Sequence, residues 1–370
     1  MEGYLVHINK WLLPLSWIYG TGVALRNFLF DIGVLKSYSY NIPIICIGNL
    51  TVGGTGKTPH TEYLVELLNQ SYKVAVLSRG YRRKSFGYLL AKQENTVEYL
   101  GDEPWQMKQK FPDIYVAVDA NRRRGIQRLC TDTTTKDVDV ILLDDAYQHR
   151  YVQAGINILL VDYYRLITDD QLLPAGRLRE PQESKNRANI VIVTKCPHNI
   201  KPMGFRVIQK ALDLKPYQKL YFSTFQYGSL RSLFGEDERK LENIKKEESV
   251  LLLTGIASPK QMHIDLQEYT SHIIPLPYPD HHFFTADDVE DINRRFAEIP
   301  FPKIIITTEK DATRLFPLSG LSEEVRKALY VLPVKVEIMR NEKHKFTERI
   351  TSYVLKNSRN SVLAQSQNDN

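Results

Sequence analysis

The residues of this chain best suited to chemistry are a Lys and a Thr that follow a run of glycines. Glycines at 48, 53, 54 and 56 precede Lys57-Thr58, with the apolar run Ile42–Ile47 before them and leucines at 64, 67 and 68 after them. The first flank predicts a buried parallel strand, and the second predicts the apolar face of a helix. Strand, glycine loop, Gly-Lys-Thr and helix is the order of a phosphate-binding loop. Its backbone N–H groups turn towards an anion, and the helix N-terminus adds partial positive charge.

This stretch is therefore predicted to bind nucleotide phosphates and Mg²⁺. Lys57 can reach the β- and γ-phosphates, and the Thr58 hydroxyl can ligate the metal ion. The usual motif has a glycine where this chain has Thr51, so a glycine-rich turn with a chance Lys is the alternative. The flanking strand and helix favour the phosphate loop. The predicted nucleotide-binding residues are Thr51, Val52, Gly53, Gly54, Thr55, Gly56, Lys57 and Thr58.

A pair of carboxylates supplies the second chemical signal. The apolar run Val138–Leu143 predicts a buried strand and is followed directly by Asp144-Asp145. An apolar strand that ends in Asp is the second metal-binding motif of P-loop enzymes. Two carboxylates at a buried strand end are costly unless a cation meets them, and Mg²⁺ would do so. A solvated turn is the alternative.

The nucleotide is predicted to be ATP rather than GTP. The strand Ile190–Val193 runs into Thr194-Lys195-Cys196-Pro197. GTPases have an Asp that binds guanine at the position of Pro197, and this chain lacks it.

Three other polar segments could contact substrate or metal. A basic and aromatic run, Arg79–Lys84, follows the predicted strand Lys73–Ser78, at the edge where open α/β sheets bind ligands. It predicts a phosphate-binding loop, with a solvated charge run as the alternative. The irregular segment 172–181 contains Arg177, Arg179 and Glu180. The third segment, Asp280-His281-His282, precedes a helix with a capping-box pattern; paired histidines suggest zinc, but no third spaced ligand is evident.

The elements that position these residues indicate an α/β protein. A length of 370 residues suggests two domains, with 43% hydrophobic residues as in an ordinary globular core. The net charge of +6 suits a phosphate-bearing ligand or an anionic membrane surface. Three separated cysteines indicate a reducing compartment without disulfides or a cysteine zinc site. We expect a P-loop domain at 42–217, an extended linker at 218–230, a smaller α/β domain at 231–356 and a frayed tail at 357–370.

The first 41 residues have a different character. No charge occurs from Trp11 to Leu25, but Pro14 and two glycines interrupt the run, and a membrane span needs about 20 apolar residues. A signal peptide is excluded because ATP chemistry belongs inside the cell. Two interpretations remain open: a helix packed on the core, or an interfacial segment. The latter would insert Trp11, Leu12, Leu13, Trp17, Ile18, Tyr19, Phe28 and Phe30 among lipid headgroups.

Eight motifs in this order resemble those of the tetraacyldisaccharide 4′-kinases of lipid A synthesis. They cover roughly residues 15–320: GNLTVGGTGKTP (48–59), RGY (79–81), GDEP (101–104), DDAYQH (144–149), LPAGRLREP (173–181), GIASP (255–259), YPDHH (278–282) and TEKDATRL (308–315). The family usually has Gly-Phe where this chain has Ala146-Tyr147, a conservative difference. The resemblance implies a P-loop NTPase-like α/β/α domain, a second α/β domain joined to it by a two-stranded linker, and an N-terminal membrane-associated helix.

The resemblance also implies an activity and a location. The enzyme would use ATP and Mg²⁺ to phosphorylate the 4′-hydroxyl of an acylated glucosamine disaccharide phosphate. It would work as a peripheral or monotopic protein on the cytoplasmic face of the inner membrane, with no nucleic acid and no obligate protein partner. A P-loop ATPase that switches a protein partner is the rival interpretation, but such a switch needs neither an acceptor hydroxyl nor a base.

Residue roles follow from the matching positions. Asp102 would be the base, oriented by His281 with support from Asp280, because a sugar hydroxyl is a poor nucleophile; helix capping alone is the alternative for Asp102. The predicted metal ligands are Thr58, Asp144, Asp145 and Glu180. The predicted substrate contacts are Arg79, Tyr81, Arg122, His149 and Arg179.

Overall fold

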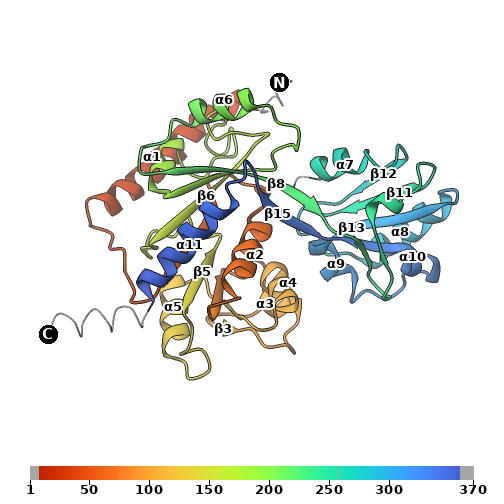
Figure 1. Cartoon of the computed structure of the whole chain (residues 1–370), viewed down its shortest axis with the longest axis horizontal. Coiled ribbons are helices and arrows are strands. Elements are labelled where there is room, and N and C mark those ends of the chain that lie inside the picture. Colours follow the sequence, from red (N-terminus) through yellow and green to blue (C-terminus); the bar gives the residue numbers. More distant parts are fainter. Residues whose placement is uncertain (1–7, 258, 359–370) are drawn as a thin grey trace. The chain divides into compact units, whose positions relative to one another are not determined.

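The computed structural model describes residues 8–257 and 259–358, which divide into two compact units. Unit 1 comprises the described residues up to Phe225 and those from Val336 onward, and unit 2 comprises Gln226–Lys335. The chain passes between the units twice, through two strands that are neighbours in one sheet (Figure 1).

Unit 1 is built on a nine-stranded sheet in the order β15-β8-β7-β6-β1-β5-β2-β4-β3. The strand that precedes the glycine loop, β1, lies between β5 and β6 and pairs with both in parallel. The short β3 at one edge pairs antiparallel with β4, and β15 at the other edge runs antiparallel to β8, where Met339 N–H donates to the Phe222 carbonyl. The bounds are β1 Ile44–Asn49, β2 Val74–Ser78, β3 Leu89–Leu90, β4 Tyr115–Val118, β5 Val140–Asp144, β6 Ile156–Asp162, β7 Ile190–Thr194, β8 Lys219–Tyr227 and β15 Val334–Ile338.

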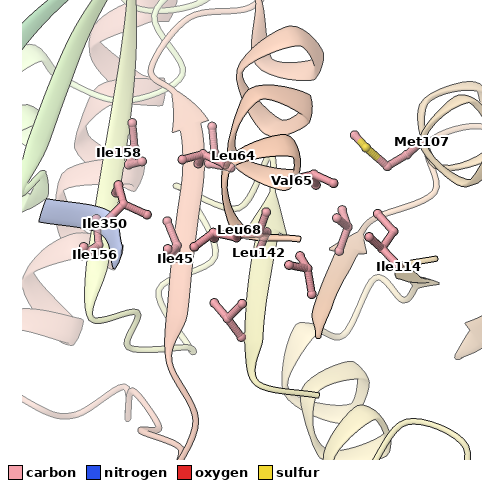
Figure 2. Packing of buried hydrophobic residues seen from close by; sticks show 14 of the residues in the cluster. Ile45, Leu64, Val65, Leu68, Met107, Ile114, Leu142, Ile156, Ile158 and Ile350 are labelled. Carbon is pink, nitrogen blue, oxygen red and sulfur yellow. The ribbon is translucent and has the colours of Figure 1, made fainter. Parts of the chain in front are cut away.

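Helices cover both faces of this sheet because alternate strand residues point to opposite sides. Ile45 of β1 packs with Leu64 and Leu68 of α2 and with Ile350 of α11 on one face (Figure 2). Ile44 lies on the other face, in the cluster that contains the buried residues of α5. The helices are α1 Leu13–Asp31, α2 Lys57–Leu68, α3 Val97–Leu100, α4 Asp102–Lys110, α5 Arg122–Thr131, α6 Pro202–Leu212 and α11 Lys343–Asn357, with 3₁₀ turns η1 Lys10–Leu12 and η2 Gln182–Arg187. The predicted mixed α/β fold with a parallel sheet is confirmed.

Unit 2 is a six-stranded sheet in the order β10-β9-β14-β13-β11-β12. Its central strands β11 and β13 are fully buried and pair in parallel, as expected for a sheet covered by helices. The strands are β9 Leu230–Ser232, β10 Glu238–Arg239, β11 Ser249–Thr254, β12 Ile273–Pro277, β13 Lys303–Thr308 and β14 Leu329–Leu332. The helices are α7 Lys260–Leu266, α8 Ala286–Glu298, α9 Glu309–Leu315 and α10 Glu323–Ala328, with the 3₁₀ turn η3 Leu241–Asn243.

The predicted bounds of the second domain are wrong at the C-terminal end. The segment 329–338 forms two strands, β14 and β15, with Pro333 between them. The second of these, β15, lies next to β8 in the sheet of unit 1. The last helix follows it, because α11 buries Phe346, Ile350 and Val354 in the core of unit 1. The predicted linker 218–230 is largely β8, a strand of the same sheet. Most of the predicted tail, from 359 onward, lies outside the described residues.

The N-terminal helix α1 lies on the surface of unit 1. Trp11, just before it, is 93% exposed and Trp17 is 70% exposed, which argues against the core-packing interpretation for these side chains. Phe30 is an exception to the interfacial interpretation, because it is buried against the Tyr151 ring at 5.0 Å. Within the described residues, none of the helices combines the length and the apolar character that crossing a membrane requires.

Candidate active site

The glycine loop between β1 and α2 has the backbone conformations that a phosphate loop requires. Gly56 immediately precedes α2 with φ of 84°, and Gly53 has φ of 115°. Side chains strain in this left-handed region. A Cβ at Gly56 would also come within 3.0 Å of the Phe225 ring. The loop thus ends at a helix N-terminus with Lys57 and Thr58 in the first turn, as predicted.

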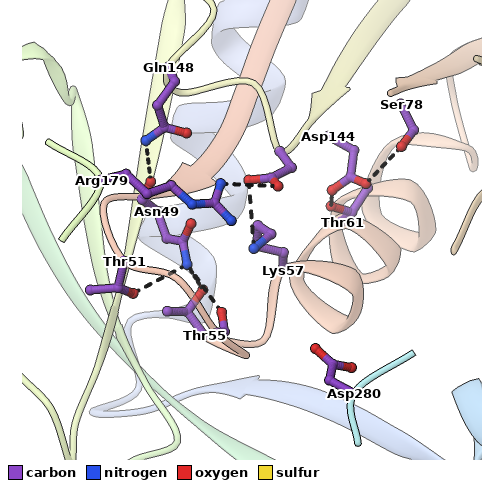
Figure 3. Close-up of polar contacts among 12 residues, drawn as sticks. Asn49, Thr51, Thr55, Lys57, Thr61, Ser78, Asp144, Gln148, Arg179 and Asp280 are labelled. Atoms are coloured by element: carbon purple, nitrogen blue, oxygen red, sulfur yellow. Dashed lines mark hydrogen bonds and ion pairs between the residues drawn. The ribbon is translucent and has the colours of Figure 1, made fainter. Parts of the chain in front are cut away.

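Side chains that the sequence analysis missed hold this loop from within. The Asn49 amide donates to the Thr55 hydroxyl at 2.9 Å (Figure 3). The Gln148 amide donates to the Asn49 carbonyl at 2.7 Å. Lys195, which is buried, donates to the Gly54 carbonyl and to the Asp162 carboxylate, the latter at 2.7 Å. These partners lie up to 141 positions away in the chain, so local patterns gave no signal of them.

The irregular segment 172–181 braces the same loop through its backbone. The Val52 N–H donates to the Arg177 carbonyl and the Arg179 N–H donates to the Leu50 carbonyl, both at 2.7 Å. This pairing explains why Arg179 stands beside the glycine loop. Its side chain then points to the acid pair (Figure 3).

Asp145 meets two cations. Lys57 Nζ lies 3.6 Å from one of its oxygens and Arg179 Nη1 lies 3.5 Å from the other. Burial opposes its ionisation, but Lys57, Arg179 and Arg122 together hold the pKa of Asp145 below its usual value. The Asp145 oxygen near Lys57 is buried and accepts no hydrogen bond from the described residues. An ionised oxygen with unused acceptor capacity fits a cation ligand.

The pKa of Asp144 is shifted in the opposite direction to that of Asp145. Asp144 is buried at the end of β5, where it accepts from the Thr61 hydroxyl at 3.2 Å and the Ser78 hydroxyl at 3.4 Å. Burial, then Glu103 and Asp145, raise the pKa of Asp144 well above the usual carboxyl range. A divalent cation would restore its charge. Hydroxyl and carboxylate oxygens, completed by phosphates and water, are the ligands Mg²⁺ prefers, so Thr58 with this acid pair fits that ion.

Two predicted ligand-binding residues have internal partners. Arg122 is 2% exposed and donates to the carbonyls of Asp119 at 2.6 Å and Asp144 at 2.9 Å. It therefore fixes the backbone below the acid pair, which does not fit the predicted substrate contact. Glu180 is buried and ion-paired through Oε2 with Arg187 at 2.8 Å, while its Oε1 accepts no hydrogen bond from the described residues, so its metal contact stays a prediction. Sequence patterns could not show either burial.

The remaining predicted residues of unit 1 flank the carboxyl ends of the strands. Arg79 and Tyr81 follow β2 and are exposed. His149 is partly buried, and burial together with surrounding arginines lowers its pKa to about 4. Asp102 is buried as the first residue of α4, while Gly101 occupies the cap position. Asp102 therefore lies in the first turn of α4, where an acidic side chain also stabilises the helix, so the purely structural alternative for Asp102 stays open.

Unit 2 contains the other half of the predicted catalytic set. Asp280 and His281 lie in the loop between β12 and α8, and His281 has a left-handed φ of 59°. Lys310 lies 3.0 Å from Asp280 and 3.1 Å from His281 Nε2. His282 bonds Asp288 of the α8 capping box at 2.8 Å. Among residues 8–257 and 259–358, no group of three or more His, Cys, Asp or Glu side chains could hold a metal, so nothing favours the zinc alternative.

Comparisons with known proteins agree with this geometry. A family model described as tetraacyldisaccharide-1-P 4′-kinase matches residues 8–354. A tetraacyldisaccharide 4′-kinase of Phocaeicola vulgatus is 56% identical over 363 residues, which cover 98% of this chain and 99% of that one. One of Bacteroides fragilis is 53% identical over 370 residues, covering 99% and 98%. A crystal structure of LpxK from Aquifex aeolicus in complex with ATP matches with a TM-score of 0.70 at 27% identity, covering 94% of this chain and 99% of that one.

Proposed function

Because the chain belongs to the tetraacyldisaccharide-1-phosphate 4′-kinase family, we propose that it transfers the γ-phosphate of ATP to the 4′-hydroxyl of a tetraacylated glucosamine disaccharide 1-phosphate. The observation on which the proposal depends is the glycine loop with Lys57 and the acid pair, in a chain that covers 99% of the Phocaeicola vulgatus relative. The rival ATPase switch is not favoured, since the relatives are named as kinases of this one lipid acceptor.

The residues of unit 1 would bind and polarise the nucleotide. The loop amides and Lys57 hold the β- and γ-phosphates, and Thr58 with Asp144 and Asp145 holds Mg²⁺. The metal ion neutralises charge on the phosphates when bound. Arg179, 3.5 Å from Asp145, adds a second cation beside Lys57. Phosphoryl transfer needs charge neutralisation and in-line positioning more than covalent chemistry, and this set supplies both.

The acceptor hydroxyl needs a base. Asp102 is the proposed base, because it is a buried carboxylate in the first turn of α4. The preceding Gly101 lies against the Tyr81 carbonyl of the predicted phosphate-binding run Arg79–Lys84. His281 orients it, with Asp280 in support. Arg79, Tyr81 and His149 are proposed to contact the acceptor. This proposal takes Asp102 from unit 1 and His281 from unit 2 and has them act together in catalysis. The last prediction in the Discussion tests this joint action.

We further propose that α1 docks on a membrane. Its exposed face presents Trp17, Ile18, Leu25 and Phe28, preceded by Trp11. Tryptophans at the edge of an apolar helix face are typical of segments that lie in the headgroup region. A lipid acceptor held in the inner membrane requires an enzyme at that surface, and ATP places it on the cytoplasmic face.

A direct transfer assay tests the activity. The protein is mixed with Mg-ATP and a detergent-dispersed tetraacylated disaccharide 1-phosphate, and the lipid is analysed by mass spectrometry. We expect a gain of one phosphate, and no gain with the matched 4′-deoxy acceptor. ATP hydrolysis at equal rates with and without acceptor, and no phosphorylated lipid, would overturn the kinase in favour of the switch.

A further inference from the structure

The motif TEKDATRL at 308–315 has no role in the activity derived above. It forms the end of β13 and the helix α9. Thr308 caps this helix by accepting from the Asp311 N–H at 3.1 Å. A cap alone needs only Thr308, so the charged residues at 310, 311 and 314 require another explanation.

Two of these residues bind α9 to neighbouring loops. Asp311 is fully buried and accepts from the Gly255 N–H at 2.9 Å; a Cβ at Gly255 would stand 2.8 Å from the carboxylate, which explains the glycine. Arg314, also buried, pairs with Asp311 at 3.2 Å and donates to the His282 carbonyl at 2.7 Å. The helix is therefore fixed against the loop that contains Asp280 and His281.

The third residue, Lys310, meets the side chains of that loop. Its ammonium lies 3.0 Å from Asp280 Oδ1 and 3.1 Å from His281 Nε2, and its side chain is only 17% exposed. An ammonium group can only donate, so Nε2 of His281 must accept. His281 is then neutral, with its proton on Nδ1, because a protonated Nε2 would direct an N–H at the cation.

We propose that Lys310 is a positioning residue of the transfer reaction: it fixes His281 in the Nδ1–H tautomer and anchors Asp280 beside it. Any hydrogen bond that His281 donates then comes from Nδ1, which defines the edge of the ring that can orient a carboxylate base. This inference rests on the proposed function, in which His281 orients the base.

Nitrogen NMR of ¹⁵N-histidine-labelled protein reads the tautomer directly. Nine histidines give a tractable spectrum, and the His281→Asn variant assigns the His281 signals by their loss. Above the titration range of the ring, we expect the Nδ1–H pattern in the unchanged chain. Lys310→Met should shift it towards Nε2–H, the form that an unconstrained histidine prefers, while Asp280→Asn should leave it in place. An Nε2–H pattern in the unchanged chain would overturn the proposal.

Kinetics test the consequence for catalysis. Lys310→Met should lower kcat by about 10-fold, less than the loss expected for removing general-base help itself, with KM for ATP unchanged. Lys310→Arg, which keeps a donor, should recover part of kcat, and it serves as the second variant if Lys310→Met folds poorly. Lys327→Met is the matched control, an 81% exposed lysine of the same unit that should match the unchanged chain.

The possible outcomes distinguish the positioning role of Lys310 from the role of His281 in the proposed function. A normal kcat and an unchanged tautomer in Lys310→Met would overturn the positioning role. A raised KM for ATP with the tautomer unchanged would also overturn it, because Lys310 would then contact nucleotide. If His281→Asn itself retains full kcat, the role of His281 in the proposed function fails, whatever the tautomer measurement shows.

Discussion

At the scale of single residues, neighbouring carboxylates in this site have opposite character. Asp145 is held ionised by Lys57 and Arg179, whereas Asp144 resists ionisation because burial and Glu103 disfavour its charge. Lys57 is thus already balanced by an acid before any nucleotide binds. Removing its charge should leave the fold intact, because Arg179 remains to compensate Asp145.

The first prediction concerns this lysine. Lys57→Ala should lower kcat by about 10²- to 10³-fold or more, as the loss of a donor to transition-state charge does. Rates of lipid phosphorylation and melting temperatures check it, with Lys92→Ala, a 71% exposed lysine of unit 1, as the control. Near-normal turnover in a folded Lys57→Ala protein would contradict the phosphate-loop assignment.

The second prediction concerns His149. Burial and nearby arginines lower its pKa from 6.5 to about 4 in the folded chain. Between pH 6.5 and about 4, His149 therefore binds a proton in the unfolded chain but not in the folded chain. Lowering the pH through this range consequently lowers the free energy of unfolding. One such proton contributes at most about 1.4 kcal/mol per pH unit.

His149→Phe should remove this contribution while keeping a ring against Tyr151, which lies 5.7 Å away. Urea unfolding at several pH values from neutral down to about 5 measures the slope. We expect the free energy of unfolding to fall less steeply with acid in the variant. Parallel slopes would show that His149 titrates normally.

At the scale of elements, α1 has two different faces. Towards the protein, the Tyr19 hydroxyl donates to the Arg179 carbonyl at 2.8 Å, and Arg26 donates to the Gln148 carbonyl at 2.7 Å. Arg179 and Gln148 are themselves residues that brace the glycine loop. Away from the protein, the helix exposes large apolar side chains. Deleting the whole segment would therefore disturb the site as well, and point substitutions on the exposed face are the sharper test.

The third prediction addresses that face. The double variant Trp11→Ser/Trp17→Ser should sediment much less with anionic liposomes, since two interfacial aromatic anchors are lost. Its melting temperature and its affinity for ATP should hold, because both side chains are exposed. Phe86→Ser, which removes a 96% exposed aromatic elsewhere in unit 1, is the control. If both variants and the unchanged chain sediment equally with liposomes, the proposal that α1 docks on a membrane is rejected.

Local patterns predicted the central elements well. The apolar runs that became β1, β5 and β7 were visible because a parallel strand buried on both faces is almost continuously apolar. The same argument placed Lys57 at a helix start and the acid pair at a strand end. Lys195 and Lys310 could not be found in this way, because their partners lie far along the chain. Asn49 could not be found because its bond to Thr55 depends on how the glycine loop folds back.

At the scale of the whole molecule, the chain leaves unit 1 through β8 and returns through β15, the two last strands at one edge of the same sheet. A linear sequence cannot show this return, since β15 and α11 have apolar patterns that would suit either unit. The physical reason is that α11 needs an apolar surface for Phe346 and Ile350, and the face beside α2 provides it. The predicted catalytic pair is thereby divided: Asp102 belongs to unit 1 and His281 to unit 2.

The last prediction tests whether the two units act together. Asp102→Ala and His281→Ala should each lower kcat by roughly 10²- to 10⁴-fold, the usual effect of losing general acid–base catalysis. The double variant should be little worse than the worse single variant, because residues that act as one unit are not additive. Affinity for ATP should barely change, since neither residue is assigned to the phosphates.

A purely structural role makes a different forecast. The Asp102 carboxylate in the first turn of α4 would then stabilise that helix by about 0.3–1 kcal/mol through its interaction with the helix dipole. Its loss would lower the melting temperature but leave kcat of the folded fraction unchanged. Glu98→Ala, at a half-exposed acid of α3, controls for nearby charge. Measuring kcat and melting temperature for the three variants separates the cases. Strictly multiplicative losses of kcat would reject a joint action of Asp102 and His281 even if each residue mattered, since independent residues contribute independent free energies.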